Sequence, residues 1–215
     1  MDSDKRGSFN QVRDLEAAKD YDNVRFSKSK RMQRLDTWEQ EFAKLVFEKV
    51  GGQQATILDM PCGNGRFFET FKGAQKLSLY DYAPTMLEAL VAKHPEAEAC
   101  DRKQGDIMTI PMDDGSVDLA FSMRLFHHIE EAEKRQKALS ELSRVSKKWV
   151  AISFYDTATW RYIRKRLRGK TPSGYAVGFG TLEKEARDVN LRIVLKHPSV
   201  SLIEQQRCVL FEKTV

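Results

Sequence analysis

Residues 57–67, with the sequence ILDMPCGNGRF, constrain the fold of this 215-residue chain more than any other stretch. An apolar run at 55–60 leads into a turn that contains Pro61, Gly63 and Gly65, and helical spacing resumes after it. This pattern predicts a buried strand, a tight turn and the start of a helix. Because glycine has no side chain, backbone N–H groups at this turn can approach a ligand closely. The turn therefore indicates a nucleotide-type cradle, although such turns are not specific by themselves.

A carboxylate follows at the spacing expected for a ribose-binding residue. The run at 76–80 predicts a second parallel strand, and Asp81 comes directly after it, about 20 residues beyond Gly63. A carboxylate in this position accepts hydrogen bonds from the two hydroxyls of a ribose. We therefore expect the ligand to contain a nucleoside.

Charge then discriminates between nucleoside ligands. Asp59 lies just before the turn, and Phe68 replaces the third glycine of the G-x-G-x-x-G pattern. Both features disfavour a pyrophosphate dinucleotide, so a nicotinamide-dependent dehydrogenase is a distant alternative. A cationic ligand fits better beside a carboxylate. S-adenosylmethionine (SAM) has a ribose, no phosphate, a sulfonium and an ammonium group, and it is the ligand that the pattern favours.

Periodicity and turn residues predict the other elements. Helices are expected at 36–50, 84–94, 130–146, 156–168 and 181–190, the last with Thr181 as its N-cap. Further strands are expected at 97–102, 117–122, 147–155, 191–195 and 206–212. The last two strands leave little room for a crossover helix, which indicates an antiparallel hairpin at the sheet edge.

The chain resembles the class I SAM-dependent methyltransferases, particularly the small ones similar to the ubiquinone/menaquinone C-methyltransferases. The resemblance is carried by residues 57–65 (ILDMPCGNG), 79–87 (LYDYAPTML) and 105–122 (GDIMTIPMDDGSVDLAFS), in the order of the first to fourth motifs of the family. It runs from about residue 55 to 128. It implies a doubly wound, Rossmann-like α/β fold with a seven-stranded, mostly parallel sheet and an antiparallel last hairpin.

The resemblance also implies a cofactor site for SAM and its product S-adenosylhomocysteine. Its expected members are Asp59, Pro61, Gly63, Gly65, Asp81, Tyr82, Met86, Asp106, Ile107, Ser122 and Arg124. Asp106 is assigned to the adenine amino group and Ile107 to packing on the ring, whereas a solvated turn aspartate is the alternative for Asp106. Arg124 could pair with the donor carboxylate, with an anionic acceptor, or with a partner inside the protein.

Candidate catalytic residues follow the fourth and fifth expected strands. His127 and His128 are possible general bases, because an imidazole titrates near neutral pH and because loops after parallel strands face the ligand crevice. Tyr155 ends the fifth strand and is a candidate for both catalysis and acceptor binding. A structural role is the alternative for all three. A base is needed for a hydroxyl or an acidic carbon, and less so for a neutral amine.

Three further residues are candidates for acceptor binding. Tyr21 belongs to residues 1–50, an expected N-terminal helical cap or lid over the SAM-binding domain at 51–215, and it could instead anchor that segment. Arg161 begins the basic run 161–170, which suits RNA, anionic lipid head groups or phosphorylated saccharides, or is a solvated helix face. Tyr175 could line the acceptor pocket or anchor its loop.

Composition limits the setting of the protein. Three cysteines without zinc-like spacing, and a start without an apolar leader, predict a reduced, cytoplasmic protein without a transmembrane segment. The four histidines show no ligand spacing, so no metal is expected. We expect methyl transfer to oxygen, nitrogen or carbon of a small or lipid-like metabolite. The alternatives are an RNA methyltransferase that uses the basic run and a non-catalytic SAM-binding regulatory or scaffold subunit.

Overall fold

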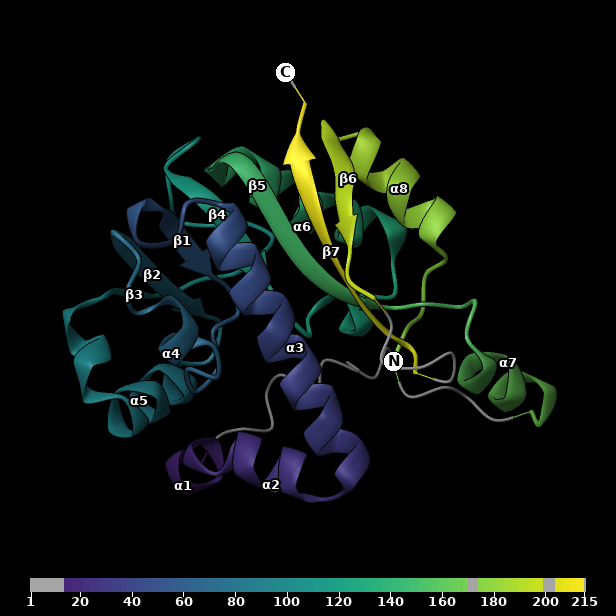
Figure 1. Cartoon of the computed structure of the whole chain (residues 1–215), viewed down its shortest axis with the longest axis horizontal. Helices are drawn as coiled ribbons and strands as arrows, with labels where there is room; N and C mark the ends of the chain where they lie inside the picture. The colour runs from purple at the N-terminus through teal and green to yellow at the C-terminus, as the bar shows by residue number, and fades with distance from the viewer. Residues whose placement is uncertain (1–13, 170–173, 199–203, 215) are drawn as a thin grey trace, which may run out of the picture.

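The computed structural model describes residues 14–169, 174–198 and 204–214, and its centre is one seven-stranded sheet (Figure 1). The strands are β1 Thr56–Asp59, β2 Lys76–Asp81, β3 Asp101–Gln104, β4 Val117–Ser122, β5 Ser146–Tyr155, β6 Leu191–Lys196 and β7 Gln206–Lys213. Their order is β3-β2-β1-β4-β5-β7-β6. The first five strands pair in parallel, whereas β7 pairs antiparallel with both β5 and β6. The predicted fold class, with an antiparallel last hairpin, is confirmed.

Helices cover both faces of this sheet. They are α1 Leu15–Lys19, α2 Tyr21–Ser27, α3 Lys30–Lys49, α4 Phe68–Phe71, α5 Pro84–Lys93, α6 Ala132–Val145, α7 Trp160–Leu167 and α8 Phe179–Arg187. Short 3-10 turns lie at Gly52–Gln54, Pro95–Ala99 and Phe126–His128. The helices α3, α4 and α5 pack on one face, and α6 and α8 pack on the other.

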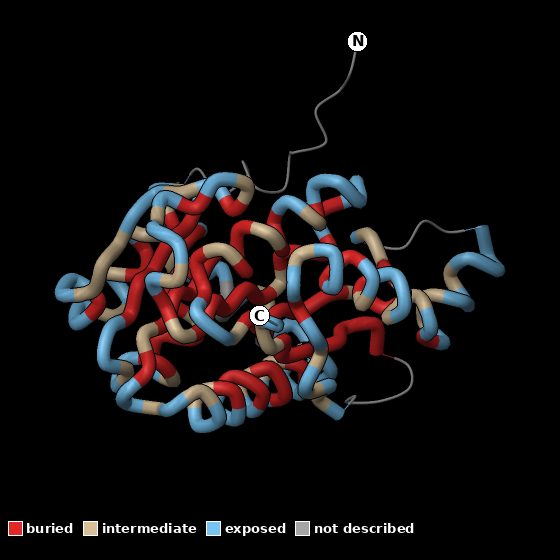
Figure 2. Tube along the Cα trace, turned by 90° about the horizontal axis from the view of Figure 1, so that it is seen from above, coloured by how far each residue is buried: buried red, intermediate tan, exposed pale blue. Residues whose placement is uncertain are grey.

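Alternation along the central strands divides the core into two layers. In β1, Ile57 packs with the α3 side and Leu58 with the α6 side, because successive strand residues point to opposite faces. The same division separates Ala151 from Ile152 in β5. The buried parts of the chain follow the sheet and the inner sides of the helices (Figure 2). The central strands are therefore buried on both faces, as is typical of doubly wound sheets.

Several predicted boundaries differ from the structure. The helix predicted at 36–50 begins earlier, at Lys30, where the Ser29 side chain accepts a hydrogen bond from the Met32 N–H. The third strand begins at Asp101, since residues 95–99 form a 3-10 turn. Thr181 is not the N-cap of α8, because that helix begins at Phe179 after Gly178.

The helix predicted from residue 156 begins later, at Trp160. Its N-cap is Thr159, whose side chain accepts a hydrogen bond from the Tyr162 N–H. Asp156 lies before the helix, where it accepts a hydrogen bond from the Ala158 N–H and lies 3.4 Å from the Arg207 guanidinium. The aspartate thus holds the bend between β5 and α7.

The N-terminal helices are joined to the rest of the fold in two ways. Trp38 and Phe42 of α3 are buried in the core against the sheet. The short helix α1 is held by Asn64, whose side-chain amide donates to the carbonyl oxygens of Ala18 and Lys19 at 3.0 and 3.3 Å. The turn after β1 therefore contacts the segment that was predicted to be a cap.

Candidate cofactor and acceptor site

The candidate site lies at the carboxyl ends of the parallel strands. Asp59, Asp81, Ser122 and Tyr155 end β1, β2, β4 and β5, which lie side by side in the sheet in the order β2-β1-β4-β5. In an open α/β sheet the ligand crevice lies outside these ends, where the strand order reverses around β1 and β4. The topology thus brings together residues that are separated by almost one hundred positions in the sequence.

The turn after β1 has the geometry of a cradle. Gly63 has a φ of +55°, and no atom lies within 4 Å of the position that a Cβ would occupy. The Gly63 N–H donates to Asp81 Oδ2 at 2.8 Å, and the Ala83 N–H donates to Oδ1 at 2.9 Å. Burial raises the pKa of Asp81, although these N–H groups oppose the shift. Asp81 thus fixes the open turn and still has lone pairs for a ribose.

Asp59 is the buried charge of this site. Neither of its carboxylate oxygens has a hydrogen-bond partner among the described residues, and the side chain is buried. Burial and the neighbouring charge of Asp81 raise the pKa of Asp59 well above its ordinary value, despite an opposing effect of Arg66. A buried carboxylate without a partner is costly, so a bound cation would stabilise its charged form.

The segment after β3 supplies the residues expected at the adenine. Ile107 is buried, and Asp106 is exposed. The Met108 N–H donates to Asp106 Oδ1 at 2.9 Å, so this aspartate makes the turn contact that its alternative assignment expected. Ser122 is buried, and its hydroxyl has no hydrogen-bond partner among the described residues. Tyr82 is exposed next to Asp81.

Three expected cofactor residues have packing roles. A Cβ on Gly65 would lie 2.9 Å from His94 Cδ2 and 3.1 Å from Leu90 Cγ, so this glycine allows the turn to pack on α5. Met86 is buried against α1 in a small cluster with Ala18 and Ala89. Pro61 is half-buried in the turn and follows a cis peptide bond. Their contact with a cofactor stays a prediction.

Arg124 is paired with a residue of the protein itself, which is one of the three alternatives that the sequence left open. Its Nε donates to Glu39 Oε2 at 2.9 Å, and Arg66 lies 2.6 Å from the same oxygen. Burial would raise the pKa of Glu39, but Arg124 and Arg66 overcome it and hold the pKa below its ordinary value. The buried Arg124 Nη2 has no hydrogen-bond partner among the described residues. This arginine can therefore still offer an N–H to an anion.

The sequence did not single out Glu39, Arg66 or Phe26. Phe26 of α2 is buried and contacts both guanidinium groups, whose carbons lie 4.2 Å (Arg66) and 4.9 Å (Arg124) from its ring centroid. A carboxylate among Trp38 and Phe42 on the apolar side of a helix was the available signal for Glu39. No sequence pattern indicated Phe26.

The candidate catalytic residues form a cluster of rings. The rings of His127 and Tyr155 are stacked, with centroids 4.2 Å apart and planes at 12°, and the ring of His128 is also 4.2 Å from that of His127. The Tyr175 N–H donates to the His127 carbonyl at 2.8 Å. A bond between Tyr175 and Glu130 raises the pKa of the tyrosine. Four predicted residues from three separate segments are thus neighbours.

Both histidines are neutral near pH 7. Burial lowers the pKa of His127 well below its ordinary value, and the charges of Arg124 and Arg25 add to the effect. The pKa of His128 is lowered to about 4 by desolvation and by the same two arginines. Such weak bases are poor at removing a proton from an acceptor at neutral pH.

The two remaining acceptor candidates lie apart. Tyr21 of α2 is exposed, and its hydroxyl accepts a 2.6 Å hydrogen bond from Arg25, so it positions a cation near the histidines. Arg161 belongs to α7, which projects from the body of the molecule in both views (Figures 1 and 2). The structure therefore does not bring Arg161 into the cluster of rings.

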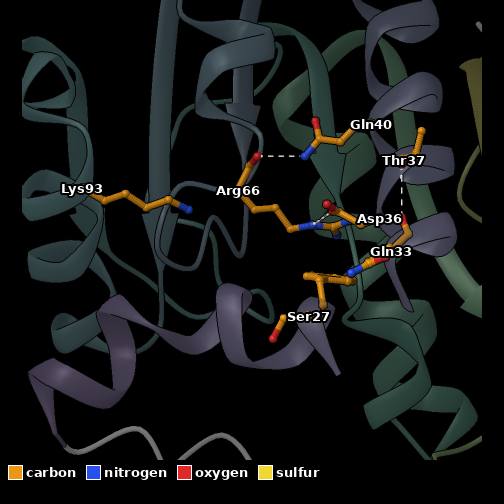
Figure 3. Close-up of a pocket in the computed structure, with 8 residues that line it drawn as sticks. Ser27, Gln33, Asp36, Thr37, Gln40, Arg66 and Lys93 are labelled. Atoms are coloured by element: carbon orange, nitrogen blue, oxygen red, sulfur yellow. Dashed lines mark hydrogen bonds and ion pairs between the residues drawn. The ribbon is translucent and has the colours of Figure 1, made fainter. Parts of the chain in front are cut away.

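An open cavity of about 650 Å³ lies beside the site, between α2, α3 and α5. Arg66 and Asp36 meet across it, and the Gln40 side chain donates to the Arg66 carbonyl at 3.0 Å (Figure 3). Lys93 approaches from the opposite wall. None of these residues was a predicted site residue.

Two kinds of feature are absent from residues 14–169, 174–198 and 204–214. No group of three or more histidine, cysteine, aspartate and glutamate side chains in them is arranged to hold a metal ion. No helix in this part of the chain has the length and apolar character needed to cross a membrane.

The sheet order defines a doubly wound α/β protein, and the turn after β1 at the strand ends is open where a cofactor could approach the main chain. A family model described as a methyltransferase domain matches residues 58–152. A malonyl-[acyl-carrier protein] O-methyltransferase from Methylococcus capsulatus is 31% identical over 147 residues, which cover 64% of this chain and 52% of that protein. The domain match and this relative support the family that the motifs predicted, the class I SAM-dependent methyltransferases.

Two further similar proteins show how much of each relative this chain covers. The tRNA (carboxymethyluridine(34)-5-O)-methyltransferase alkbh8 from Xenopus tropicalis is 25% identical over 130 residues, or 57% of this chain and 20% of that protein. Magnesium protoporphyrin IX methyltransferase from Synechocystis PCC 6803, solved with bound S-adenosylhomocysteine, has a TM-score of 0.75 at 12% identity and covers 93% of this chain and 98% of its own. The chain thus spans about half or less of the two curated relatives but nearly all of the structural neighbour.

Proposed function

We propose that this protein transfers the methyl group of SAM to a carboxylate oxygen of a small or lipid-like metabolite. The observation that carries the cofactor assignment is the buried Asp59, whose two oxygens have no hydrogen-bond partner among the described residues. When bound, SAM would supply a methyl group on a sulfonium, whose positive charge makes the adjacent carbon electrophilic. Asp59 would favour that cationic end, and Asp81 the ribose hydroxyls.

Gly63 fits the same ligand. Space is open where its Cβ would be, so a nucleoside can approach the main chain at this turn. The hydrogen bond from Gly63 to Asp81 keeps the turn and the ribose carboxylate in a fixed relation. A preformed site of this kind lowers the ordering cost of binding.

The ring cluster supports an acceptor that has no proton to lose. A carboxylate oxygen attacks through a lone pair, and the C–S bond electrons leave with sulfur, so charge balances without a base. His127 and His128 are neutral and weakly basic, which suits this case better than a hydroxyl acceptor. Arg25 and Arg124 are close enough to act electrostatically on both histidines and would attract an anion.

The names of the curated relatives agree with transfer to oxygen. Those of the Methylococcus and Xenopus proteins both specify O-methyl transfer, and they name a malonyl and a carboxymethyl group. Both groups contain a carboxyl carbon. We extend only this chemistry to the present chain, as part of the proposal.

The test is calorimetric titration with SAM and S-adenosylhomocysteine, followed by incubation of methyl-labelled SAM with a fractionated lysate. Mild alkali cleaves methyl esters and releases volatile methanol, whereas N-methyl and C-methyl products keep their label. We expect SAM binding and alkali-labile label in a low-mass or lipid fraction. Alkali-stable label in that fraction would reject the carboxylate acceptor but keep the methyltransferase, and absence of SAM binding would reject both.

An RNA acceptor is the second candidate, favoured by the Xenopus relative that acts on tRNA and by the basic helix α7. In that case label would appear in RNA, and RNA binding would weaken steeply with salt. Replacement of Arg164 and Arg168 by glutamine would reduce both the affinity and its salt dependence.

A non-catalytic SAM-binding subunit is the third candidate. It would bind SAM with the affinity expected for an enzyme but methylate nothing in any fraction. Label transfer that appears only after a second lysate fraction is added would identify the partner that such a subunit requires.

A further inference from the structure

The helix α7 exposes an apolar stripe that nothing in the described chain covers. Trp160, Ile163 and Leu167 are 56%, 43% and 78% exposed, and α7 contains no buried residue. Their spacing of three and four residues places them on one side of the helix. Isolated apolar side chains are common on surfaces, but three in line on one short helix form an exposed stripe.

The rest of this helix is strongly basic. Residues 160–168 include five arginine or lysine residues and no acidic residue. Arg164 and Arg168 are exposed and lie one and two turns along from Trp160, so they flank the stripe. Neither has a carboxylate within ion-pair distance in the part of the chain that the structure describes.

The position of α7 determines on which side of the molecule this surface lies. The helix follows β5, so it begins at the same edge of the sheet as Asp59, Asp81 and the ring cluster. It projects from the body of the molecule in both views (Figures 1 and 2). Anything that binds the stripe would therefore lie on the side of the molecule where the acceptor enters.

We propose that α7 docks the protein on the surface of a membrane that contains anionic lipids. Such interfacial helices combine a basic face with exposed tryptophan, leucine or isoleucine, and they lie in the headgroup plane instead of spanning the bilayer. Trp160 would lie at the interface, Ile163 and Leu167 would enter the acyl boundary, and the arginines would contact lipid phosphates.

The basic residues and the apolar stripe of α7 together favour an anionic membrane over RNA as the partner. A phosphate backbone would satisfy Arg164 and Arg168 but would leave Ile163 and Leu167 in water. An anionic bilayer is complementary to the cations and to the apolar stripe together. The inference concerns binding alone and does not depend on the methyl acceptor.

The test measures co-sedimentation of the full chain, without SAM, with vesicles of phosphatidylcholine alone and of equal parts phosphatidylcholine and phosphatidylserine. We expect binding to the mixed vesicles that weakens at high salt, and little binding to phosphatidylcholine alone. A blue shift of tryptophan fluorescence should accompany binding and be reduced in Trp160→Phe.

Two double variants separate the two contributions. Arg164→Gln with Arg168→Gln should weaken binding roughly 30-fold, because each cation near an anionic surface contributes about fivefold. Ile163→Ser with Leu167→Ser, which keeps the charge, should weaken it by roughly tenfold or more. The matched controls are Lys184→Gln with Arg187→Gln on α8 and Leu45→Ser on α3, all exposed and outside α7, and they should lose less.

The outcomes are decisive in either direction. Loss of binding in the α7 variants, with folding and SAM affinity retained, supports the proposal. It is overturned if mixed vesicles bind no better than phosphatidylcholine, if the Ser variants bind normally, or if the chain binds RNA and ignores vesicles. Because SAM affinity is measured separately, failure of the cofactor site would be recognised as a different result.

Discussion

The main-chain N–H of Gly63 donates a 2.8 Å hydrogen bond to Asp81, so the carboxylate after β2 fixes the turn after β1. Under the proposed cofactor assignment, this side chain has two functions. It orders the cradle, and it is the residue assigned to the ribose. The cofactor site is consequently sensitive to Asp81 in two ways, one through the ligand and one through the turn.

Replacement of Asp81 by alanine should weaken SAM binding by at least roughly tenfold, because ribose hydrogen bonds of about 0.5–1.5 kcal/mol each are lost together with the order of the turn. Calorimetric titration measures the effect. Asp113→Ala, which removes an exposed aspartate from a different turn, is the control. Equal affinity in the two variants would contradict the ribose assignment.

Gly63→Ala separates backbone strain from contact with the ligand. Gly63 and Gly115 have φ values of +55° and +58°, and neither has a neighbour close enough to clash with a Cβ. Alanine should therefore cost each site a similar free energy of unfolding, about 1–2 kcal/mol. Only Gly63→Ala should also lose SAM affinity, because its Cβ would occupy the cradle. Matched affinities of the two variants would show that no ligand approaches Gly63.

Glu39→Gln should reduce the free energy of unfolding by about 3–5 kcal/mol, since it leaves two buried guanidinium groups without their shared counter-ion. Glu41 lies two residues further along α3 and is exposed, so Glu41→Gln should change the free energy of unfolding by less than about 0.5 kcal/mol. Chemical denaturation provides the measurement. A small effect at Glu39 would mean that water compensates the arginines.

The rate of methyl transfer should survive the loss of either histidine. For His127→Ala and His128→Ala at saturating SAM, with the acceptor found by labelling, we expect kcat to fall less than tenfold, whereas loss of a general base typically costs about 100-fold or more. A larger fall, together with a pH profile that titrates near 6.5, would assign that histidine as the base.

Acid should destabilise the fold through the same two residues. An unfolded histidine has a pKa of about 6.5, whereas the folded pKa of His128 is about 4 and that of His127 is also lowered. Between the folded and unfolded values the unfolded chain binds more protons, so stability is complete above about pH 6.5 and falls as the pH decreases through this window. A His127→Asn, His128→Asn variant should show a shallower decrease between pH 6.5 and 4. Parallel curves for both proteins would refute the shift.

The strand ends and the open turn of the candidate cofactor site were predictable because their signals are local. Asp59, Gly63 and Asp81 lie next to strand ends, where charge and glycine spacing carry information in a single sequence. The third strand was misplaced for the opposite reason. Asp101–Gln104 is a polar strand at the sheet edge, so it lacks the apolar pattern that identifies β1 and β4.

The other half depends on contacts between distant segments. Glu39 and Arg124 are 85 residues apart, and Phe26 reaches both arginines from a third segment. No local pattern encodes such a group, although a glutamate among the apolar positions of α3 indicates that a buried partner exists. The neutral state of the histidines was likewise unpredictable, because it results from burial and from Arg25 in the N-terminal segment.

Arg66 and Arg124 share Glu39 as their counter-ion, and this limits how the N-terminal segment of the protein could be engineered. A protein shortened to begin at residue 51 would keep every cofactor residue but would lose the counter-ion of Arg66 and Arg124 and expose the sheet face under α3. Exchange of the N-terminal segment with that of a relative would have to transfer a carboxylate at this position, or replace both arginines at the same time. The N-terminal segment and the two arginines of the later chain therefore have to be inherited together.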